Sequence, residues 1–356
     1  MGLAILGIGT SVPSEPISQS RAAEMTSIVA GHNADEATKL SVLYGLTGVR
    51  RRHVSMLDEG EVVPESVSGS PNGPSTGWRM NRYEEKVGPM ALRAAAEALE
   101  RSGIDGSTLT HLVTVSCTGF SAPGFDLGLI HDLKLNPSIQ RTHVGFMGCH
   151  GALNGLRVAR AIVGSEPNSR VLLCAAELCS LHFRYGGDLG QTITNALFAD
   201  GAAALVASSS SSEHSSVWSV VANGSYVVPN SADAMTWRIR DHGFEMTLSP
   251  EVPALIKHNL AGWMEGWLGE NGLTIADVGA WAVHPGGPKI LDAVRTTLAL
   301  NADAMADARE ILSGFGNISS PTILFLIDRL MKRNADRPCV ALGFGPGLAV
   351  EAALIR

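Results

Sequence analysis

No apolar run in the 356-residue sequence reaches the roughly 20 residues that a membrane-spanning helix requires. The first residues, "MGLAILGIGTSVP", also lack the basic segment and the small-residue cleavage site of a secretory signal peptide. They predict instead a first β-strand that ends between Gly9 and Pro13. We therefore expect a cytoplasmic protein without a membrane span.

Cysteine is scarce, and its five positions are Cys117, Cys149, Cys174, Cys179 and Cys339. Their number is odd, they are widely scattered, and no C-x-x-C pair occurs, so neither a disulfide framework nor a zinc site is indicated. A reducing compartment fits this pattern. We expect neither a metal ion nor another bound cofactor.

Basic residues are outnumbered, with 27 Lys and Arg against 34 Asp and Glu and a net charge of −7. We therefore expect no broad surface for nucleic acid. The densest basic run is "GVRRRH", residues 48–53. It is either a solvated surface turn or a local site for a phosphorylated ligand, which arginine binds through charge-assisted hydrogen bonds.

The sequence alternates Gly- and Ala-rich helical segments with short Val- and Leu-rich strands, which is typical of a layered α/β fold. Apolar residues at helical spacing predict a helix over 87–104 that is stopped by Gly103. Nearly continuous apolar runs predict buried strands over 111–117 and 170–178. The polar run "ASSSSSEHSS", residues 207–216, predicts an exposed loop between halves over 1–210 and 211–356.

The two halves repeat one order of elements, although their sequences hardly match. Helix, strand, "GFMGCHGALNGLRVARAIV" and strand in the first half correspond to helix, strand, "GFGNISSPTILFLIDRLM" and strand in the second. This internal duplication matches Cys149 with Asn317 and places His284 at the end of the strand that corresponds to 111–117. Pseudo-twofold packing of the halves would bring these three residues together.

Cys149 lies where a helix is predicted to begin, between Gly148 and Gly151 and ahead of a stop at Gly164. The helix dipole and the free N–H groups at that end favour an anion, so we expect the pKa of its thiol to fall. A free cysteine is more often a small buried hydrophobe. The two glycines permit a sharp turn and close approach of a ligand, and they favour a nucleophile here.

Two residues could assist such a nucleophile. His284, at a strand end before Pro285, could hold the thiolate and donate to an oxyanion. Its alternative is a surface or core histidine with satisfied hydrogen bonds. Asn317 is either the N-cap of the next helix or an amide donor to a developing oxyanion. Cys149, His284 and Asn317 together indicate a catalytic site more strongly than any one of them alone, because all three occupy equivalent positions of a duplicated fold.

These residues resemble the thiolase superfamily and, within it, the type III polyketide synthases, which are chalcone synthase-like enzymes. The motifs that carry the resemblance follow the family order along essentially the whole chain: "GCHGALNGLRVAR" around Cys149, "ALFADGAAALV" (196–206), "HPGGPKILD" (284–292), "GFGNISS" (314–320) and "GFGPGLAVE" (343–351). The resemblance implies the duplicated, layered α-β-α-β-α fold of thiolases and a homodimer.

The resemblance also implies an activity. Cys149 would carry an acyl group from an acyl-CoA starter, while His284 and Asn317 would stabilise the enolate formed when malonyl-CoA loses CO2. Repeated decarboxylative Claisen condensation and cyclisation would give a pyrone, a resorcinol or a related polyketide. CoA would be held by Arg50, Arg51 and Arg52, with Gly286 and Gly287.

The pocket residues implied by the resemblance are Cys117, Glu177, Cys179, His182, Phe198, Trp237, Met246 and Ser319. Phe198 matches a gate between the CoA tunnel and the pocket, although core packing is its alternative. Met246 replaces a second gate phenylalanine, and Trp237 stands where plant chalcone synthases have glycine. These departures argue against a coumaroyl starter and favour the bacterial enzymes that make alkylpyrones or alkylresorcinols from fatty acyl starters.

Three alternatives remain open from the sequence. The first is a single-round condensing enzyme of the ketoacyl synthase III type, and the second is a chalcone- or stilbene-type synthase with an aromatic starter. The third is a non-catalytic thiolase-like module that binds acyl groups for a partner. The presence of all three of Cys149, His284 and Asn317 argues against the third.

Overall fold

The computed structural model describes residues 2–13, 15–55, 72–185, 189–210 and 217–356. The strands are β1 (Leu3–Ser11), β2 (Ile17–Ser18), β3 (Arg51–Arg52), β4 (His111–Ser116), β5 (Gln140–Gly145), β6 (Arg170–Leu178), β7 (Asp200–Ser209), β8 (Ser219–Val227), β9 (Met235–Arg240), β10 (Gly243–Leu248), β11 (Ala280–Val283), β12 (Cys339–Gly345) and β13 (Ala349–Ile355). The helices are α1 (Gln19–Ala30), α2 (Ala34–Gly45), α4 (Thr76–Ser102), α5 (Phe125–Asp132), α6 (Gly151–Ser165), α7 (Leu189–Leu197), α8 (Val252–Glu270), α9 (Pro288–Thr297), α10 (Ala306–Phe315) and α11 (Thr322–Lys332).

A nine-stranded sheet in the order β11-β12-β13-β8-β1-β7-β6-β4-β5 contains the predicted duplication. The row β4-β6-β7-β1 and the row β11-β12-β13-β8 share one pattern, in which the first two strands are parallel and the next two pairs are antiparallel. The rows meet where β1 pairs antiparallel with β8, at Leu3 with Val220 and Ala4 with Ser219. Strand topology thus confirms the duplicated fold that the sequence pattern predicts.

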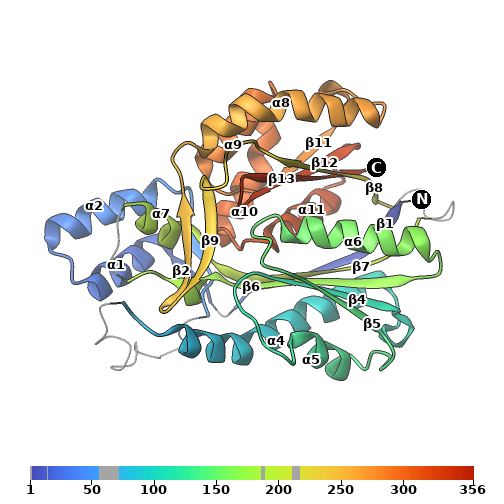
Figure 1. The fold of residues 1–356 in the computed structure, drawn as a ribbon, viewed down its shortest axis with the longest axis horizontal. Coiled ribbons are helices and arrows are strands. Elements are labelled where there is room, and N and C mark those ends of the chain that lie inside the picture. Colours follow the sequence, from blue (N-terminus) through green and yellow to red (C-terminus); the bar gives the residue numbers. More distant parts are fainter. Residues whose placement is uncertain (1, 14, 56–71, 186–188, 211–216) are drawn as a thin grey trace.

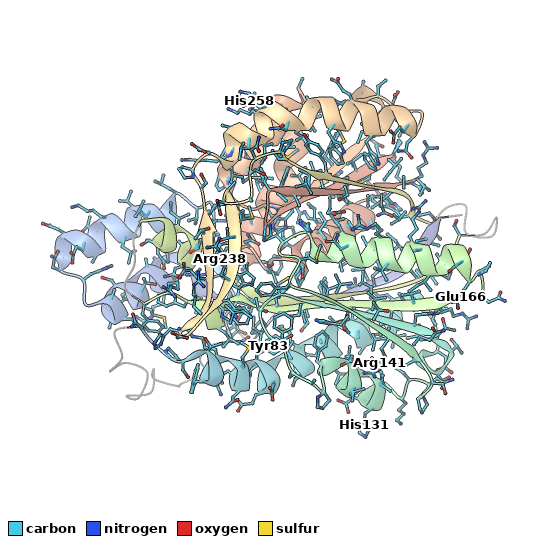
Figure 2. The ribbon with its side chains drawn as sticks, viewed as in Figure 1. Tyr83, His131, Arg141, Glu166, Arg238 and His258 are labelled. Atoms are coloured by element: carbon cyan, nitrogen blue, oxygen red, sulfur yellow. The ribbon has the colours of Figure 1, made fainter. Side chains whose placement is uncertain are left out.

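Five layers result from this arrangement (Figure 1). Helices α6 and α11 lie in the middle and contact strands of both rows. Helices α4 and α5 cover one outer face, whereas α8 and α9 lie on the other. Figure 2 shows the side chains of His131, Glu166 and His258 at the periphery, while Tyr83 of α4 is buried. The layers leave α6 and α11, which carry the predicted motifs, in the interior.

Two predicted boundaries are wrong. The helix predicted over 87–104 begins already at Thr76, capped by Ser75, and it continues through Pro89 because buried Arg79 and Tyr83 anchor its first turns. Gly103 ends it as predicted, in the left-handed conformation (φ 66°). The loop predicted over 207–216 begins late, since residues 207–209 pair with β1 in strand β7. Residues 211–216 lie outside the described part, so the boundary between the halves at 210 stays a prediction.

Within the described ranges, the structure contains no helix long and apolar enough to cross a membrane. The same ranges hold no group of three or more His, Cys, Asp or Glu side chains arranged to bind a metal ion.

Candidate active site

Cys149 lies in the tight turn between β5 and α6, one residue before the N-cap His150. Gly148 has φ 79°, and a Cβ added there would clash with the ring of Pro346. The turn therefore requires glycine. The Cys149 side chain is 5% exposed. The predicted placement at a helix start is confirmed, although α6 continues past Gly164 to Ser165.

His284 follows β11 directly, and its backbone N–H donates to the Leu342 carbonyl of β12 at 2.8 Å. The imidazole is 1% exposed, and neither ring nitrogen has a hydrogen-bond partner among the described residues. Burial, together with the neighbouring His150, lowers the pKa of His284 from 6.5 to about 3. The ring is therefore neutral at physiological pH, and it lies beside the residue that follows Cys149.

Asn317 is held by backbone hydrogen bonds to the chain around Phe198. Its N–H donates to the Leu197 carbonyl at 2.9 Å, and its carbonyl accepts from Ala199 N–H at 2.9 Å. The next helix, α11, begins only at Thr322, so the N-cap role considered for Asn317 is wrong. Its Oδ1 accepts the Ser319 N–H at 2.8 Å. The amide NH2 can therefore face the Cys149 thiol, to which Asn317 is hydrogen-bonded.

The electrostatic expectation for Cys149 is wrong. Burial raises the pKa of its thiol from 9.0 to about 11, although hydrogen bonds from Ser319 and Asn317 oppose the rise. The Ser319 hydroxyl lies 3.6 Å from Sγ. Dehydration thus outweighs the favourable field at the start of α6. The thiol must therefore lose its proton before it can act as a nucleophile.

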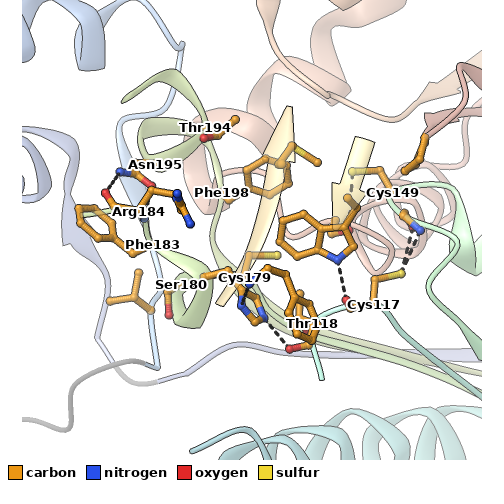
Figure 3. Close-up of a pocket in the computed structure, with 18 of the residues that line it drawn as sticks. Cys117, Thr118, Cys149, Cys179, Ser180, Phe183, Arg184, Thr194, Asn195 and Phe198 are labelled. Carbon is orange, nitrogen blue, oxygen red and sulfur yellow. Dashed lines mark hydrogen bonds between the residues drawn. The ribbon is translucent and has the colours of Figure 1, made fainter. Parts of the chain in front are cut away.

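An elongated pocket extends from Cys149 and encloses roughly 750 Å³, its open mouth included. All the predicted pocket residues except Glu177 line it: Cys117, Cys179, His182, Phe198, Trp237, Met246 and Ser319. Figure 3 shows Cys149 and Cys117 at one end, Phe198 and Cys179 between, and Arg184, Asn195 and Phe183 at the other end.

Glu177 is fully buried beneath this pocket rather than on its wall. Its carboxyl accepts hydrogen bonds from the Cys117 N–H (2.9 Å) and from the hydroxyls of Thr118 (2.7 Å) and Ser320 (2.6 Å). Burial raises its pKa despite these donors. Glu177 ties the end of β4 to the segment after Asn317, which is a positioning arrangement on both sides of Cys149.

The ring nitrogens of Trp237 and His182, which also line the pocket, are all hydrogen-bonded. Trp237 donates its indole N–H to the Cys117 carbonyl at 2.8 Å. His182 stacks on Phe244 with ring centroids 4.2 Å apart, and its Nε2 lies 2.7 Å from the Thr118 carbonyl. Burial lowers the pKa of His182 to about 3, so this ring is also neutral.

The basic run 48–53 separates into two environments. Arg50 and Arg51 are exposed, whereas Arg52 is 4% exposed and lines the pocket. The Arg52 guanidinium donates to the carbonyls of Asn195 and Phe198. Gly286 and Gly287 lie between His284 and α9, and Gly287 has φ 150°. The surface-turn interpretation is wrong for Arg52, whose predicted contact with CoA stays a prediction.

Several pocket residues were missed from the sequence, among them Thr118, Arg184, Asn195, Phe244 and Pro346. Phe244 and Pro346 could have been found from their neighbours Met246 and "GFGPG". Arg184 could have been found because it lies two positions after His182, which was already a predicted pocket residue. Asn195 lies on the helix before Phe198 and gives no local signal.

Family comparisons cover nearly the whole chain. Residues 2–211 match the N-terminal domain of chalcone and stilbene synthases, and residues 219–356 match the C-terminal domain. The chain is 29% identical to "Alpha-pyrone synthesis polyketide synthase-like Pks18" of Mycobacterium tuberculosis over 98% of its own length and 90% of that protein. It is also 29% identical to the "3,5-dihydroxyphenylacetyl-CoA synthase" of Amycolatopsis balhimycina, covering 98% and 92%.

Solved structures agree with this assignment. PKS-I of the brown alga Ectocarpus siliculosus superimposes with a TM-score of 0.94 at 29% identity, covering 100% of this chain and 98% of that one. The C-terminal type III polyketide synthase domain of Steely1 from Dictyostelium gives a TM-score of 0.92 at 26% identity. The chain therefore belongs to the chalcone and stilbene synthase family of type III polyketide synthases, which are acyltransferases.

Proposed function

We propose that the protein condenses malonyl-CoA repeatedly onto an acyl starter carried by Cys149 and cyclises the product to a pyrone or resorcinol. The observation that carries the proposal is the environment of Cys149 at the end of the pocket. Asn317 and Ser319 are hydrogen-bonded to the Cys149 thiol, and a buried, unbonded His284 lies beside His150.

Loading begins with proton transfer from the Cys149 thiol to the neutral His284. The thiolate attacks the thioester carbonyl of the starter, the C–S bond to CoA breaks, and CoA leaves as its thiol after taking up the proton. Burial disfavours a free thiolate, so the charge exists mainly when the substrate is in place. The Ser319 hydroxyl and the Asn317 amide stabilise it.

Extension uses the same donors. An N–H of His284 and the amide of Asn317 would hold the thioester carbonyl of malonyl-CoA, and loss of CO2 leaves the electron pair as an enolate on that oxygen. The enolate carbon attacks the Cys149 thioester, the C–S bond breaks, and the thiolate is released. The chain, longer by two carbons and attached to CoA, returns to Cys149 for the next round.

The names of the relatives support cyclisation products of two kinds, an α-pyrone for Pks18 and an aromatic dihydroxyphenylacetyl thioester for the Amycolatopsis enzyme. The exposed side chains of Arg50 and Arg51 are proposed to bind CoA phosphates. Their joint replacement by Gln should raise KM for malonyl-CoA, and an unchanged KM would remove that assignment.

A homodimer in the cytoplasm is also proposed. The edge strand β5 and its surroundings carry exposed apolar side chains, namely Phe120 (42% exposed), Leu127 (42%) and Met147 (37%). Exposed apolar side chains near a sheet edge favour self-association. Sedimentation equilibrium should give about twice the chain mass of 37.4 kDa, and a single-chain mass would contradict the dimer.

Product profiling tests the activity. Incubation with a ladder of acyl-CoA starters and malonyl-CoA should give cyclised products that contain several malonyl units, detected by mass spectrometry. Cys149→Ala should abolish them. His284→Gln and Asn317→Ala should abolish malonyl-CoA decarboxylation while sparing part of the acyl loading on Cys149. A β-ketoacyl product from one round alone would favour the ketoacyl synthase alternative, and unchanged products from Cys149→Ala would exclude the proposed nucleophile.

A further inference from the structure

His150, the residue after Cys149, is a buried polar side chain at the start of α6. Its imidazole is 2% exposed, and Nδ1 lies 2.7 Å from Oδ1 of Asn154, one turn along the helix. Because an amide oxygen accepts hydrogen bonds, Nδ1 carries the proton in this arrangement. Burial lowers the pKa of His150, so the ring is neutral at physiological pH. The hydrogen bond to Asn154 therefore holds a neutral ring in one orientation.

The His150 ring packs against the backbone of β12, where glycine leaves room for it. A Cβ added at Gly345 would lie 2.4 Å from Cδ2 and 2.6 Å from Nε2 of this ring, which is too close for real atoms. A Cβ added at Gly343 would lie 3.2 Å from the Cβ of His150. Glycine inside a strand often marks a site of such close approach. Strand β12 therefore has room for the ring only while residue 345 is glycine.

The same short stretch of chain contacts two further parts of the site. The Leu342 carbonyl accepts the backbone N–H of His284 at 2.8 Å. Pro346 packs on the other neighbour of Cys149, Gly148, where an added Cβ would lie 2.4 Å from the proline ring. The residues on both sides of Cys149 thus rest on the stretch that also holds His284. This stretch fixes where the turn and the histidine lie relative to each other.

His150 is not among the described residues that line the pocket. Its side chain is therefore placed to act on Cys149 through the backbone rather than on a substrate. We propose that His150 is a positioning residue, whose packing on Gly345 holds the turn of Cys149 against β12 and thereby fixes its place relative to His284. The inference rests on the proposed role of Cys149 as the acylated nucleophile and adds the contact that this role requires.

The test is a double-mutant cycle of His150→Ala and Gly345→Ala. Acylation of Cys149 by hexanoyl-CoA is followed by mass spectrometry of the intact protein, without malonyl-CoA. Each single variant should load about tenfold to a hundredfold more slowly than the unaltered protein, because a small displacement of a reacting group is costly. The double variant should load no more slowly than His150→Ala, since the added methyl group occupies space that the ring has left. A double variant whose loss equals the product of the two single losses, within about twofold, would overturn the proposal.

A control variant separates positioning from stability. Val163→Ala truncates a buried side chain of α6 that is not among the described pocket residues. It should lower the free energy of unfolding in urea at least as much as His150→Ala does, because it leaves a cavity, and it should load at the unaltered rate. His150→Ala should lower the maximal loading rate and leave the hexanoyl-CoA concentration for half-maximal loading unchanged. A Val163→Ala protein that loads as slowly as His150→Ala would show that stability alone is responsible, and the proposal would be wrong.

A conservative replacement tests the ring itself. His150→Phe combined with Asn154→Leu keeps a ring on Gly345 and replaces both hydrogen-bond partners by apolar groups, so it should load within about threefold of the unaltered protein. His150→Ala combined with Asn154→Leu should stay as slow as His150→Ala. Equal losses in the two combinations would contradict the role of the ring. Condensation is scored separately, from the products that the unaltered protein makes with malonyl-CoA, so a failure of the proposed function is distinguished from a failure of this contact.

Discussion

Ser319 holds an unusual backbone conformation next to Cys149, the proposed nucleophile. Its φ is 59°, in the left-handed region that few non-glycine residues adopt, and its hydroxyl lies 3.6 Å from the Cys149 sulfur. Such backbone strain is often retained at functional sites. Here the conformation directs a hydroxyl at a thiol whose thiolate form is otherwise destabilised by burial.

Removal of this hydroxyl should raise the pKa of Cys149 further above 11. Ser319→Ala is therefore expected to slow alkylation by iodoacetamide at fixed pH by about tenfold, the effect of one charge-assisted hydrogen bond. Ser319→Gly should slow alkylation equally but raise Tm, since glycine removes the strain at positive φ. Ser320→Ala is the matched control, because that hydroxyl donates to Glu177 instead. A pH profile of alkylation that is identical in Ser319→Ala and the unaltered protein would contradict the role.

Residue identity was predictable for Cys149 and His284, because glycine or proline neighbours mark the turns in which they lie. The protonation state of Cys149 was not, since it depends on dehydration by segments distant in sequence. Glu177 shows the same limit. Its hydroxyl partners Thr118 and Ser320 lie in different halves of the chain, so its place beneath the pocket follows only from their packing.

At the scale of elements, the turn from β5 into α6 determines where the proposed nucleophile Cys149 lies. Gly148 is fixed both by its positive φ and by the ring of Pro346, which follows β12. The turn therefore packs directly against Pro346 of the "GFGPG" motif. A side chain at 148 has no space unless one of the two moves.

Gly148→Ala should displace Cys149 and reduce product formation by about a hundredfold or more, because small misplacement of a reacting group is costly. Gly164→Ala in the same helix is the control. Its added Cβ meets nothing within 4 Å, and it should raise stability by about 0.5–1 kcal/mol without affecting the rate. Turnover and Tm of both variants check this. A Gly148→Ala enzyme with normal turnover would show that the turn tolerates the shift.

The element order was predictable from hydrophobic periodicity, and strand 170–178 agrees with β6 residue for residue. The start of α4 was not predictable. Proline is typical of the first turn of a helix, so Pro89 suggests a start near that position, and the polar residues before it lack the apolar periodicity that would predict a longer helix. Arg79 and Tyr83 are buried there only through tertiary packing.

At the scale of the whole molecule, burial of neutral histidines makes stability depend on pH. The pKa of His284 and of His182 is lowered from 6.5 to about 3, so the unfolded chain binds more protons than the folded protein between these values. The free energy of unfolding therefore decreases as pH falls below 6.5, by about 1.4 kcal/mol per pH unit for each ring. The raised pKa values of Glu177 and Asp200 act in the opposite direction.

The contribution of His284 to this pH dependence can be isolated by comparing a variant with the unaltered protein. Between pH 7.5 and 5.5, His284→Gln should lose about 1.4 kcal/mol less stability than the unaltered protein in urea unfolding. Gln is suitable here because neither ring nitrogen of His284 has a partner in the described residues that would be lost. Equal losses in the two proteins would show that His284 is charged in the folded state.

The backbone bridge between Phe198 and Asn317 has a consequence for how such enzymes diversify. Backbone hydrogen bonds join Asn317 to Leu197 and Ala199 on either side of Phe198, so this link does not depend on which side chain stands at position 198. Mutation can therefore enlarge or narrow the passage without altering the reaction. Substrate range and chemistry can evolve as separate traits, although their residues lie side by side.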